Sequence, residues 1–180
     1  MDLVKFQNDA YPAIQAYLDK HPTFAKYNFK ICYCTNLVLN DLSTLKNKKH
    51  FNWDAEVSGS DAMYMEGESP LKFAIYTNNL PVGYVLGRID PDTCAFEIFY
   101  TEVSNFYTFF DKCGWIRLII DILSALKICL ETADTSMVVD KIVQINPVPS
   151  TISNFVDMGF EYDASYTTRS EGMVLNLHEK

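Results

Sequence analysis

The sequence predicts a mixed α+β domain with a central, mostly antiparallel sheet that contains one parallel pair of strands and is flanked by helices. Two observations lead to this fold class. Three β-rich runs joined by short turns fill residues 71–103, and a long apolar helix at 114–131 separates them from another β-rich run at 136–146. Tight turns join antiparallel strands, whereas a strand–helix–strand connection allows parallel pairing.

The composition favours one well-packed domain that does not bind nucleic acid. The chain has 180 residues, of which 48% are hydrophobic and 14% aromatic, and this is enough for a buried core. Its formal net charge is −8, whereas a general nucleic-acid binder normally presents a basic face. The acidic balance favours solubility and is also compatible with a cationic partner such as an amine.

The cysteines and the start of the chain predict a cytoplasmic protein without a metal or a membrane partner. The five cysteines contain no C-x-x-C pair and no second pair that would complete a zinc site. No apolar run reaches ~18 residues without a charge, and the first residues lack the apolar region of a signal peptide. We therefore expect reduced thiols in an intracellular compartment.

The first predicted element is a helix over residues 8–21. Its apolar side chains form a stripe, and Asn8 or Asp9 can serve as the N-cap. Pro12 fits the first turn, where its missing N–H is not needed, and Pro22 ends the helix.

A β-rich run at 29–39 follows, and we expect it to be a strand. Residues 41–52 are polar and rich in lysine, and they show no periodicity that predicts an element. We therefore divide the chain into an N-terminal helical and strand segment, 1–70, and a core, 71–180, which are expected to form the same domain.

The core begins with a predicted antiparallel meander of three strands at 71–77, 82–89 and 93–103. The helix after it begins near Gly114 and is apolar on most sides, which implies burial against the sheet. A helix N-terminus presents backbone N–H groups and the positive end of the helix dipole. The junction before this helix therefore suits an anion such as a phosphate.

The last third of the chain is predicted to return to the sheet. After the strand at 136–146, two prolines break the chain, and residues 150–157 form a short helix with Ser150 as its cap. Gly159 takes the left-handed position that ends this helix. Residues 162–177 form a final hairpin.

Four short stretches, together with the order of the elements, match a known family. They are P-V-G-Y at 81–84, the strand residues 97–103, Asn146 at the end of the parallel strand, and N-F-V-D-M-G-F at 154–160. In these features residues 71–177 resemble the GNAT superfamily of acyl-CoA-dependent N-acetyltransferases. The first seventy residues show no resemblance to a known family.

The resemblance implies where acetyl-CoA, the cosubstrate, would bind. It would lie where the strands ending near Val103 and Asn146 separate, with backbone N–H near Val103 holding the thioester carbonyl. Asn146 would bond the pantetheine amides, and Phe155 would lie near the thiol. The start of the long helix would meet the diphosphate with Lys112, Cys113, Gly114, Trp115, Ile116 and Arg117.

Three positions depart from the family pattern. The family loop resembles Arg/Gln-x-x-Gly-x-Gly/Ala, and alignment on Gly114 puts Asp111 at the basic position and Ile116 at the second glycine. A β-branched side chain does not allow the same close approach of a diphosphate. Phe155 stands where many members have a tyrosine that protonates the leaving thiolate. Tyr100 and Tyr162 are alternative donors, although each also fits a packed aromatic role.

The resemblance places a catalytic base on the strand at 93–103, where Glu97 and Glu102 are the candidates. Because they are five positions apart on an alternating strand, they should point to opposite faces and not form a pair. Glu97 lies in an apolar run, where burial would make a carboxylate more basic. The alternative for Glu97 is a solvated strand face. Glu102 stands where the resemblance implies a strand bulge and a cleft, and its alternative is a rim carboxylate.

Three functions fit these observations. The first is acetyl transfer from acetyl-CoA to a small-molecule or protein amine by direct attack. The second is a GNAT-fold protein that has lost catalysis and serves as a CoA-binding or protein-interaction module. The third is an unrelated α+β domain, because a fold does not fix a function.

Overall fold

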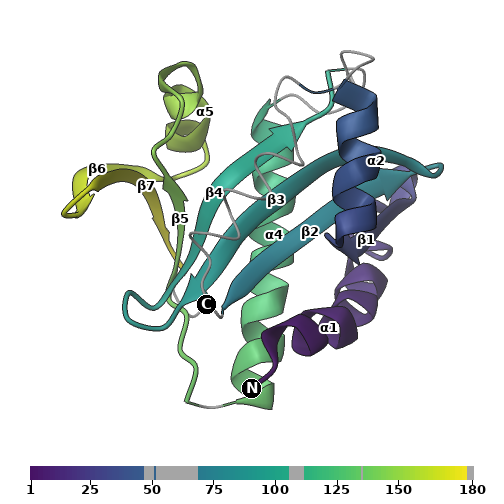
Figure 1. The fold of residues 1–180 in the computed structure, drawn as a ribbon, viewed down its shortest axis with the longest axis horizontal. Coiled ribbons are helices and arrows are strands. Elements are labelled where there is room, and N and C mark those ends of the chain that lie inside the picture. Colours follow the sequence, from purple (N-terminus) through teal and green to yellow (C-terminus); the bar gives the residue numbers. More distant parts are fainter. Residues whose placement is uncertain (47–50, 52–68, 106–111, 135, 178–180) are drawn as a thin grey trace.

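The computed structural model describes residues 1–46, 51, 69–105, 112–134 and 136–177. Its centre is a seven-stranded sheet in the order β1-β2-β3-β4-β5-β7-β6 (Figure 1). The strands are β1 (Phe29–Tyr33), β2 (Pro70–Thr77), β3 (Leu80–Asp90), β4 (Ala95–Val103), β5 (Lys141–Ile145), β6 (Glu161–Thr167) and β7 (Ser170–Asn176). Only β4 and β5 pair in parallel among these strands, and every other neighbouring pair is antiparallel.

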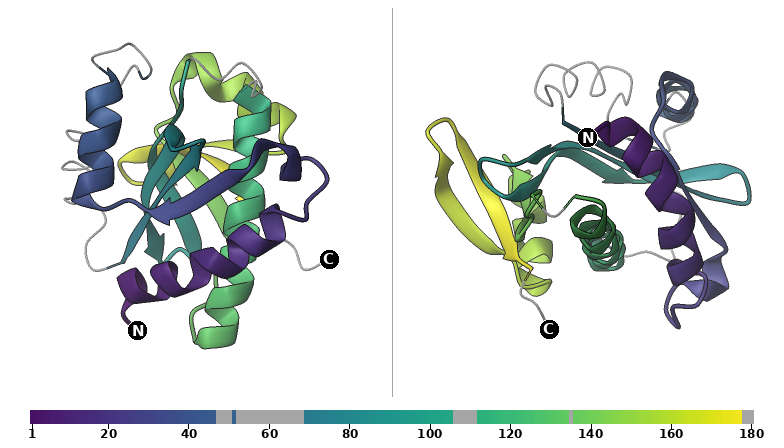
Figure 2. Two further views of the ribbon diagram at one scale, coloured as in Figure 1. Left: turned by 90° about the vertical axis from the view of Figure 1, so that its right-hand side faces the viewer. Right: turned by 90° about the horizontal axis from the view of Figure 1, so that it is seen from below.

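Helices lie on both faces of the sheet. They are α1 (Leu3–Leu18), α2 (Asn36–Lys46), α4 (Lys112–Ala133) and α5 (Ile152–Asp157), with short 3₁₀ turns at Ala25–Tyr27 and Pro149–Thr151. The long helix α4 covers one face and α2 lies over the other (Figure 2, right). We call these the α4 face and the α2 face.

Two hydrophobic cores follow from this layering. The larger core joins the sheet to α1 and α4, and its fully buried residues include Phe73, Phe96 and Leu123. The smaller core lies on the α2 face, where Leu42 packs with the sheet residue Tyr84. Alternate side chains of the central strands therefore enter different cores, which explains why β2 and β3 are buried along most of their length.

The predicted fold class is confirmed. The meander forms β2, β3 and β4, the long helix precedes a strand that pairs in parallel with β4, and β6 and β7 form the final hairpin. Gly159 has a φ of +90°, as expected for the residue that ends a helix. The strand predicted at 29–39 contributes β1, so the N-terminal segment shares the same sheet.

The first helix was wrongly bounded. It begins at Leu3, where the Asp2 carboxylate accepts hydrogen bonds from the backbone N–H groups of Val4 and Lys5, and it ends at Leu18. Asn8 is therefore an interior helix residue and not a cap, and Pro12 lies inside the helix. An aspartate directly before an apolar residue was the available signal.

The strand predicted at 29–39 was too long, because it ends at Tyr33 and α2 begins at Asn36. The Thr35 hydroxyl accepts a hydrogen bond from the Val38 N–H at 3.4 Å, which fits a helix start. Leu39 and Leu42 lie three positions apart and are both buried, and this helical spacing was overlooked.

Smaller differences between prediction and structure concern the chain from α4 onward. The parallel strand is limited to Lys141–Ile145, and α4 already includes Lys112. The short helix α5 begins at Ile152, after a 3₁₀ turn that starts at Pro149, so Ser150 is not its cap.

Candidate functional site

The parallel pair β4–β5 separates halfway along β4. Residues Ala95 to Ile98 pair with Lys141 to Gln144, and no further residues of the two strands pair. Beyond this point β4 continues to Val103, whereas β5 ends at Ile145. Both strands run toward the end of the sheet where α4 begins and α5 lies, which is the top of Figure 1.

A β-bulge lies at the same place on β4. On β3, Leu86 pairs with Tyr100 and the next residue, Gly87, pairs with Ile98, so Phe99 is the extra residue. Any Cβ at Gly87 would lie 2.0 Å from the backbone oxygen of Glu97, so only glycine allows this approach of the two strands. Phe99 and Tyr100 consequently both pack into the core on the α2 face.

The bulge corrects the expectation that Glu97 and Glu102 point to opposite faces. Phe96 and Ile98 belong to the core on the α4 face, so Glu97 between them points to the α2 face. Glu102 pairs with Tyr84, whose side chain is in the core on the α2 face. The two carboxylates therefore share a face, but about 15 Å of strand separates them, and they form no direct pair.

Glu97 is buried and hydrogen-bonded at both oxygens, with an exposed fraction of 1%. Its Oε2 accepts a bond from Arg88 Nε at 2.7 Å, and its Oε1 accepts one from the Tyr166 hydroxyl at 2.9 Å. The Thr93 hydroxyl lies 3.3 Å from the same Oε1. The solvated-face alternative for Glu97 is therefore wrong.

Arg88 extends this network to a second acid. Its Nη2 donates to Asp90 Oδ2 at 2.6 Å, and its guanidinium lies 5.9 Å from the centre of the Phe99 ring. Burial raises the pKa of Tyr166, and its hydrogen bond to Glu97 acts in the same direction. Sequence reasoning missed Arg88 and Tyr166, because Tyr166 is 69 positions from Glu97 and nothing in its own strand indicates that contact.

Gln144 is the last residue of β5 that pairs with β4. Its side chain is 5% exposed, and its Nε2 donates to the backbone oxygens of Ile145 at 3.2 Å and Phe99 at 3.5 Å. Its Oε1 is buried and accepts no hydrogen bond from the residues that the structure describes. The neighbours Val143 and Ile145 are in the core on the α2 face, so the Gln144 side chain points toward the α4 face.

The first described turn of α4 lies at the same end of the sheet. Trp115 is 3% exposed, and its Nε1 donates to the Thr101 hydroxyl at 3.0 Å. Ile116 is buried in the main core, Gly114 is half-buried, and Arg117 is exposed. The side chains of Trp115 and Ile116 are thus core residues, and only their backbone is left for the predicted role at a diphosphate.

The other predicted cofactor-binding residues surround the separation of β4 and β5. Val103 pairs with Gly83 and packs against the main core, and the Cys113 thiol lies 4.0 Å from Asn154 Oδ1 on α5. Asn146 is exposed and has a φ of +45°. The topology therefore brings Val103, Cys113 and Asn146 to one end of the sheet, whereas the predicted Asp111 lies outside the described residues.

Phe155 on α5 is buried. Its ring packs edge-on against Phe160, with centroids 5.2 Å apart, inside the main core. Of the alternative proton donors, Tyr100 is half-buried in the smaller core, and Tyr162 is half-exposed with its hydroxyl donating to Glu171 at 2.5 Å. Packing therefore positions the Tyr100 ring, and a hydrogen bond to a surface acid positions the Tyr162 hydroxyl.

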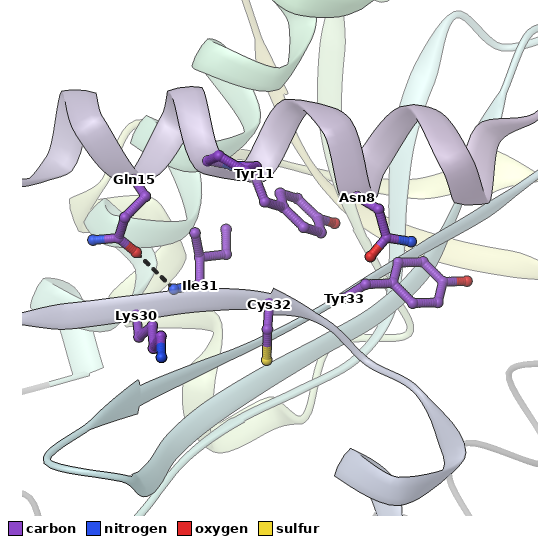
Figure 3. A pocket seen from close by; sticks show the side chains of 8 residues that line it. Asn8, Tyr11, Gln15, Lys30, Ile31, Cys32 and Tyr33 are labelled. Atoms are coloured by element: carbon purple, nitrogen blue, oxygen red, sulfur yellow. Dashed lines mark hydrogen bonds between the residues drawn. The ribbon is translucent and has the colours of Figure 1, made fainter.

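A separate cavity of about 330 Å³ lies at the far edge of the sheet, between α1 and β1 (Figure 3). Tyr11 and Gln15 border it from the helix, and Ile31 and Tyr33 border it from the strand. Gln15 Oε1 accepts a hydrogen bond from the Ile31 N–H at 2.8 Å. Since β1 is three strands away from β4 in the sheet, this cavity is not part of the site at the β4–β5 separation.

The described part of the chain contains no cluster of three His, Cys, Asp or Glu side chains that could hold a metal ion. None of the helices within those residues is both long enough and apolar enough to cross a membrane.

Comparison with known proteins shows which solved structures share this fold. No protein-family model matches the chain, and no curated protein sequence does either. Solved structures do match, among them the ribosomal-protein-S18-alanine N-acetyltransferase of Escherichia coli, with a TM-score of 0.56 and 15% identity over 84% of this chain and 96% of that one.

Two further solved structures also match the fold of the chain. An aminoglycoside N-acetyltransferase matches with a TM-score of 0.53 and 18% identity, over 82% of this chain and 96% of that one. The GNAT domain of an S. lividans protein matches with a TM-score of 0.53 and 11% identity, over 82% of this chain and 89% of that one. The parallel β4–β5 pair within an otherwise antiparallel seven-stranded sheet thus belongs to a known architecture, and the chain has the fold of the GNAT N-acetyltransferases.

Proposed function

We propose that this protein is an acyl-CoA-dependent N-acyltransferase that transfers an acetyl group from acetyl-CoA to an amine. The observation that supports this most is the separation of β4 from β5 directly after Ile98 and Gln144, beside the start of α4. The likeness to solved N-acetyltransferases supports the same proposal. We further propose that the protein acts in the cytoplasm, where its free thiols stay reduced.

The residues at the separation fit the arm of acetyl-CoA, which supplies the activated acyl group when it is bound. The buried Oε1 of Gln144 accepts no hydrogen bond from the described part of the chain, so an acceptor is available beside the backbone of β4. Val103 and Asn146 offer backbone and amide groups at the same end. The first turn of α4, from Lys112 to Arg117, offers a helix N-terminus to the diphosphate.

The transfer requires three events around one carbon atom. The amine nitrogen forms a bond to the thioester carbonyl carbon, the carbon–sulfur bond breaks, and CoA leaves as the thiolate. The amine must also give up a proton to a base. Backbone N–H groups on β4 near Val103 would stabilise the charge that develops on the carbonyl oxygen.

We propose Glu102 as the base and Glu97 as a positioning residue. Both oxygens of Glu97 already accept hydrogen bonds from Arg88 and Tyr166, so taking a further proton there would break the network. Glu102 is half-buried, stands past the bulge and lies on the same face. Glu97 would then link Tyr166 on β6 to β4 and hold this part of the hairpin in place.

The acceptor is proposed to be a small-molecule or protein amine. One of the structural neighbours is named for an alanine of a ribosomal protein and another for an aminoglycoside, so this fold accommodates both classes. The net charge of −8 would attract a protonated amine.

A second function is a CoA-binding or interaction protein without catalysis. Phe155 favours it, because this side chain has no proton for a leaving thiolate and is fixed in the core against Phe160. Ile116 favours it too, because a buried β-branched side chain stands at the position of a family glycine.

An acetyl-CoA titration followed by thermal unfolding tests the proposal. A ligand at 100 times its dissociation constant should raise the free energy of unfolding by about 2.7 kcal/mol. Release of free thiol in the presence of an amine panel then identifies transfer. Stabilisation without thiol release would support a CoA-binding protein without catalysis. The absence of any stabilisation would contradict the transferase and favour the interaction protein.

A variant pair tests the assignment of the base. Glu102→Gln should lower kcat strongly and leave KM for acetyl-CoA nearly unchanged, because the lost group acts in the transfer step. The same exchange at Glu161, an exposed acid on the edge strand β6, is the control. Equal kcat values for wild type and Glu102→Gln would contradict a role of Glu102 as base.

A further inference from the structure

Gln144 combines two properties that rarely occur together in a native core. Its side chain is almost fully buried, with an exposed fraction of 5%, and among the described residues none donates a hydrogen bond to its Oε1. Most buried side-chain polar atoms in proteins have a partner, so each exception calls for an explanation. This exception lies at the residue where β5 separates from β4.

The Nε2 donor of the same amide makes only long hydrogen bonds. Its Nε2 lies 3.5 Å from the Phe99 oxygen and 3.2 Å from the Ile145 oxygen, at or beyond the long end of ordinary N–H···O bonds. The first of these oxygens belongs to the bulge residue of β4. The amide therefore bridges the two strands at the point where their own backbone pairing has ended.

Gln7 in the same protein shows what a satisfied buried glutamine looks like. It is 0% exposed, and its Nε2 donates to Pro70 O at 2.6 Å and to Leu3 O at 3.0 Å. Its Oε1 accepts bonds from the Lys72 N–H at 3.0 Å and the Tyr11 hydroxyl at 2.9 Å. The fold is thus able to satisfy a buried carboxamide completely, and it does not do so at Gln144.

We propose that the Gln144 Oε1 accepts a hydrogen bond from an amide N–H of a ligand that lies between β4 and β5. The inference rests on the proposed function, in which this ligand is the amide-containing arm of acyl-CoA. An amide in this arm carries an N–H that can donate to Oε1. Binding would therefore pair an atom that has no partner among residues 1–46, 51, 69–105, 112–134 and 136–177.

The inference assigns Gln144 a positioning role, and this role has a signature that a structural glutamine would not give. Removing a buried acceptor without a partner relieves the ligand-free protein of a desolvated group. Removing the same acceptor also deprives the ligand of a bond. Stability without ligand and affinity for the ligand should therefore change in opposite directions.

The experiment compares Gln144→Leu with Gln7→Leu in the full chain. We expect Gln144→Leu to raise the midpoint of thermal unfolding without ligand and to weaken CoA binding roughly tenfold by calorimetry, which is about 1.4 kcal/mol. Gln7→Leu should lower the unfolding midpoint and leave the CoA dissociation constant unchanged. Gln144→Met serves as a second variant of similar length if leucine packs poorly.

A second probe separates the arm from the nucleotide. Adenosine 3′,5′-bisphosphate lacks the amide-containing arm, so its dissociation constant should be the same for wild type and Gln144→Leu. A tenfold loss for this nucleotide as well would overturn the assignment of Gln144 to the arm.

The outcomes distinguish this inference from the function on which it rests. If wild type does not bind CoA, the proposed function and this inference both fail. If wild type binds CoA and both Gln144 variants bind it equally well, only the inference fails. A drop in the unfolding midpoint of both Gln144 variants, with unchanged affinity, would show that Gln144 has a structural role such as holding a buried water.

Discussion

The indole Nε1 of Trp115 donates a hydrogen bond of 3.0 Å to the Thr101 hydroxyl, and this contact joins the first turn of α4 to the half of β4 beyond the bulge. Trp115 is 3% exposed, so its ring fills the space between the helix and the sheet. The position of the α4 N-terminus relative to the β4–β5 separation thus depends on the Trp115 side chain and on the residue that packs beneath its ring.

The first prediction concerns Gly83, which lies beneath that ring. A Cβ on Gly83 would meet two ring atoms of Trp115, at 2.6 and 2.8 Å, and the backbone oxygen of Glu102 at 2.6 Å. Gly83→Ala should therefore lower the free energy of unfolding by about 1–3 kcal/mol, as overpacking does in other cores. Urea denaturation measures this loss.

Trp115→Phe provides the control for this prediction, because phenylalanine lacks the two ring atoms that would clash. In the Trp115→Phe background, Gly83→Ala should cost less than in wild type, which a double-mutant cycle detects. An equal cost in both backgrounds would assign the strain to the Glu102 backbone alone.

The second prediction concerns the buried network of Glu97. Glu97→Gln removes the charge that faces Arg88 Nε at 2.7 Å, and we expect it to lower the free energy of unfolding by about 1–3 kcal/mol. The estimate is below the range for fully buried pairs, because Arg88 is 35% exposed and keeps its bond to Asp90. Tyr166→Phe should cost about 1 kcal/mol.

The two changes should couple, because the Tyr166 hydroxyl and Glu97 Oε1 lie 2.9 Å apart. In urea denaturation the double variant should lose less than the sum of the single losses. If Glu97→Gln instead kept full stability and abolished turnover, Glu97 would be the base and the assignment to Glu102 would be wrong.

Sequence reasoning predicted the elements that repeat a regular pattern. The meander from Pro70 to Val103 consists of β-rich runs with short turns, and the helix at Lys112–Ala133 is too apolar to lie anywhere but against the sheet. These features determine that β4 and β5 are parallel neighbours, and with that the place of the candidate site.

The resemblance implied a bulge near Glu102, but sequence reasoning did not locate the features that depend on contacts between distant segments. The bulge at Phe99 arises because Gly87 on another strand lets the backbone of Glu97 approach closely. Alternation counted along β4 alone therefore placed Glu102 on the wrong face. Arg88 and Tyr166 around Glu97 were missed for the same reason, because their contacts join β3, β4 and β6.

The third prediction concerns the exposed edge of β1. Gln15 Nε2 donates to Phe29 O at 2.5 Å and its Oε1 accepts from the Ile31 N–H at 2.8 Å, so one side chain occupies the backbone groups that a neighbouring strand would use. Gln15→Leu should lower the free energy of unfolding by about 1 kcal/mol and cause self-association that increases with concentration.

Light scattering coupled to size exclusion measures that association. Asn8→Ala is the matched control, because Asn8 is exposed on the same helix and its side-chain amide donates to Val4 O within that helix. A Gln15→Leu protein that stays at the wild-type mass at all concentrations would contradict the role of Gln15 in protecting the edge.

The fourth prediction concerns the Cys34 thiol, which is 2% exposed in the core on the α2 face. Burial, assisted by the neighbouring Cys32, raises its pKa from 9.0 to about 12. The folded state therefore favours the neutral thiol, and the stability that this contributes is complete below pH 9 and lost as the pH rises from 9 toward 12. Wild type should thus lose stability over this range more steeply than Cys34→Ala.

Chemical labelling checks the same site independently. Because the thiolate is the reactive form, iodoacetamide at about pH 8.5 should alkylate Cys34 more slowly than the half-exposed Cys94 and Cys129, as read by peptide mass spectrometry. In concentrated guanidinium chloride the difference should vanish, because all the thiols are then exposed to water. Equal rates in the folded protein would mean that Cys34 is not buried in solution, and the packing of α2 on the sheet would be wrong.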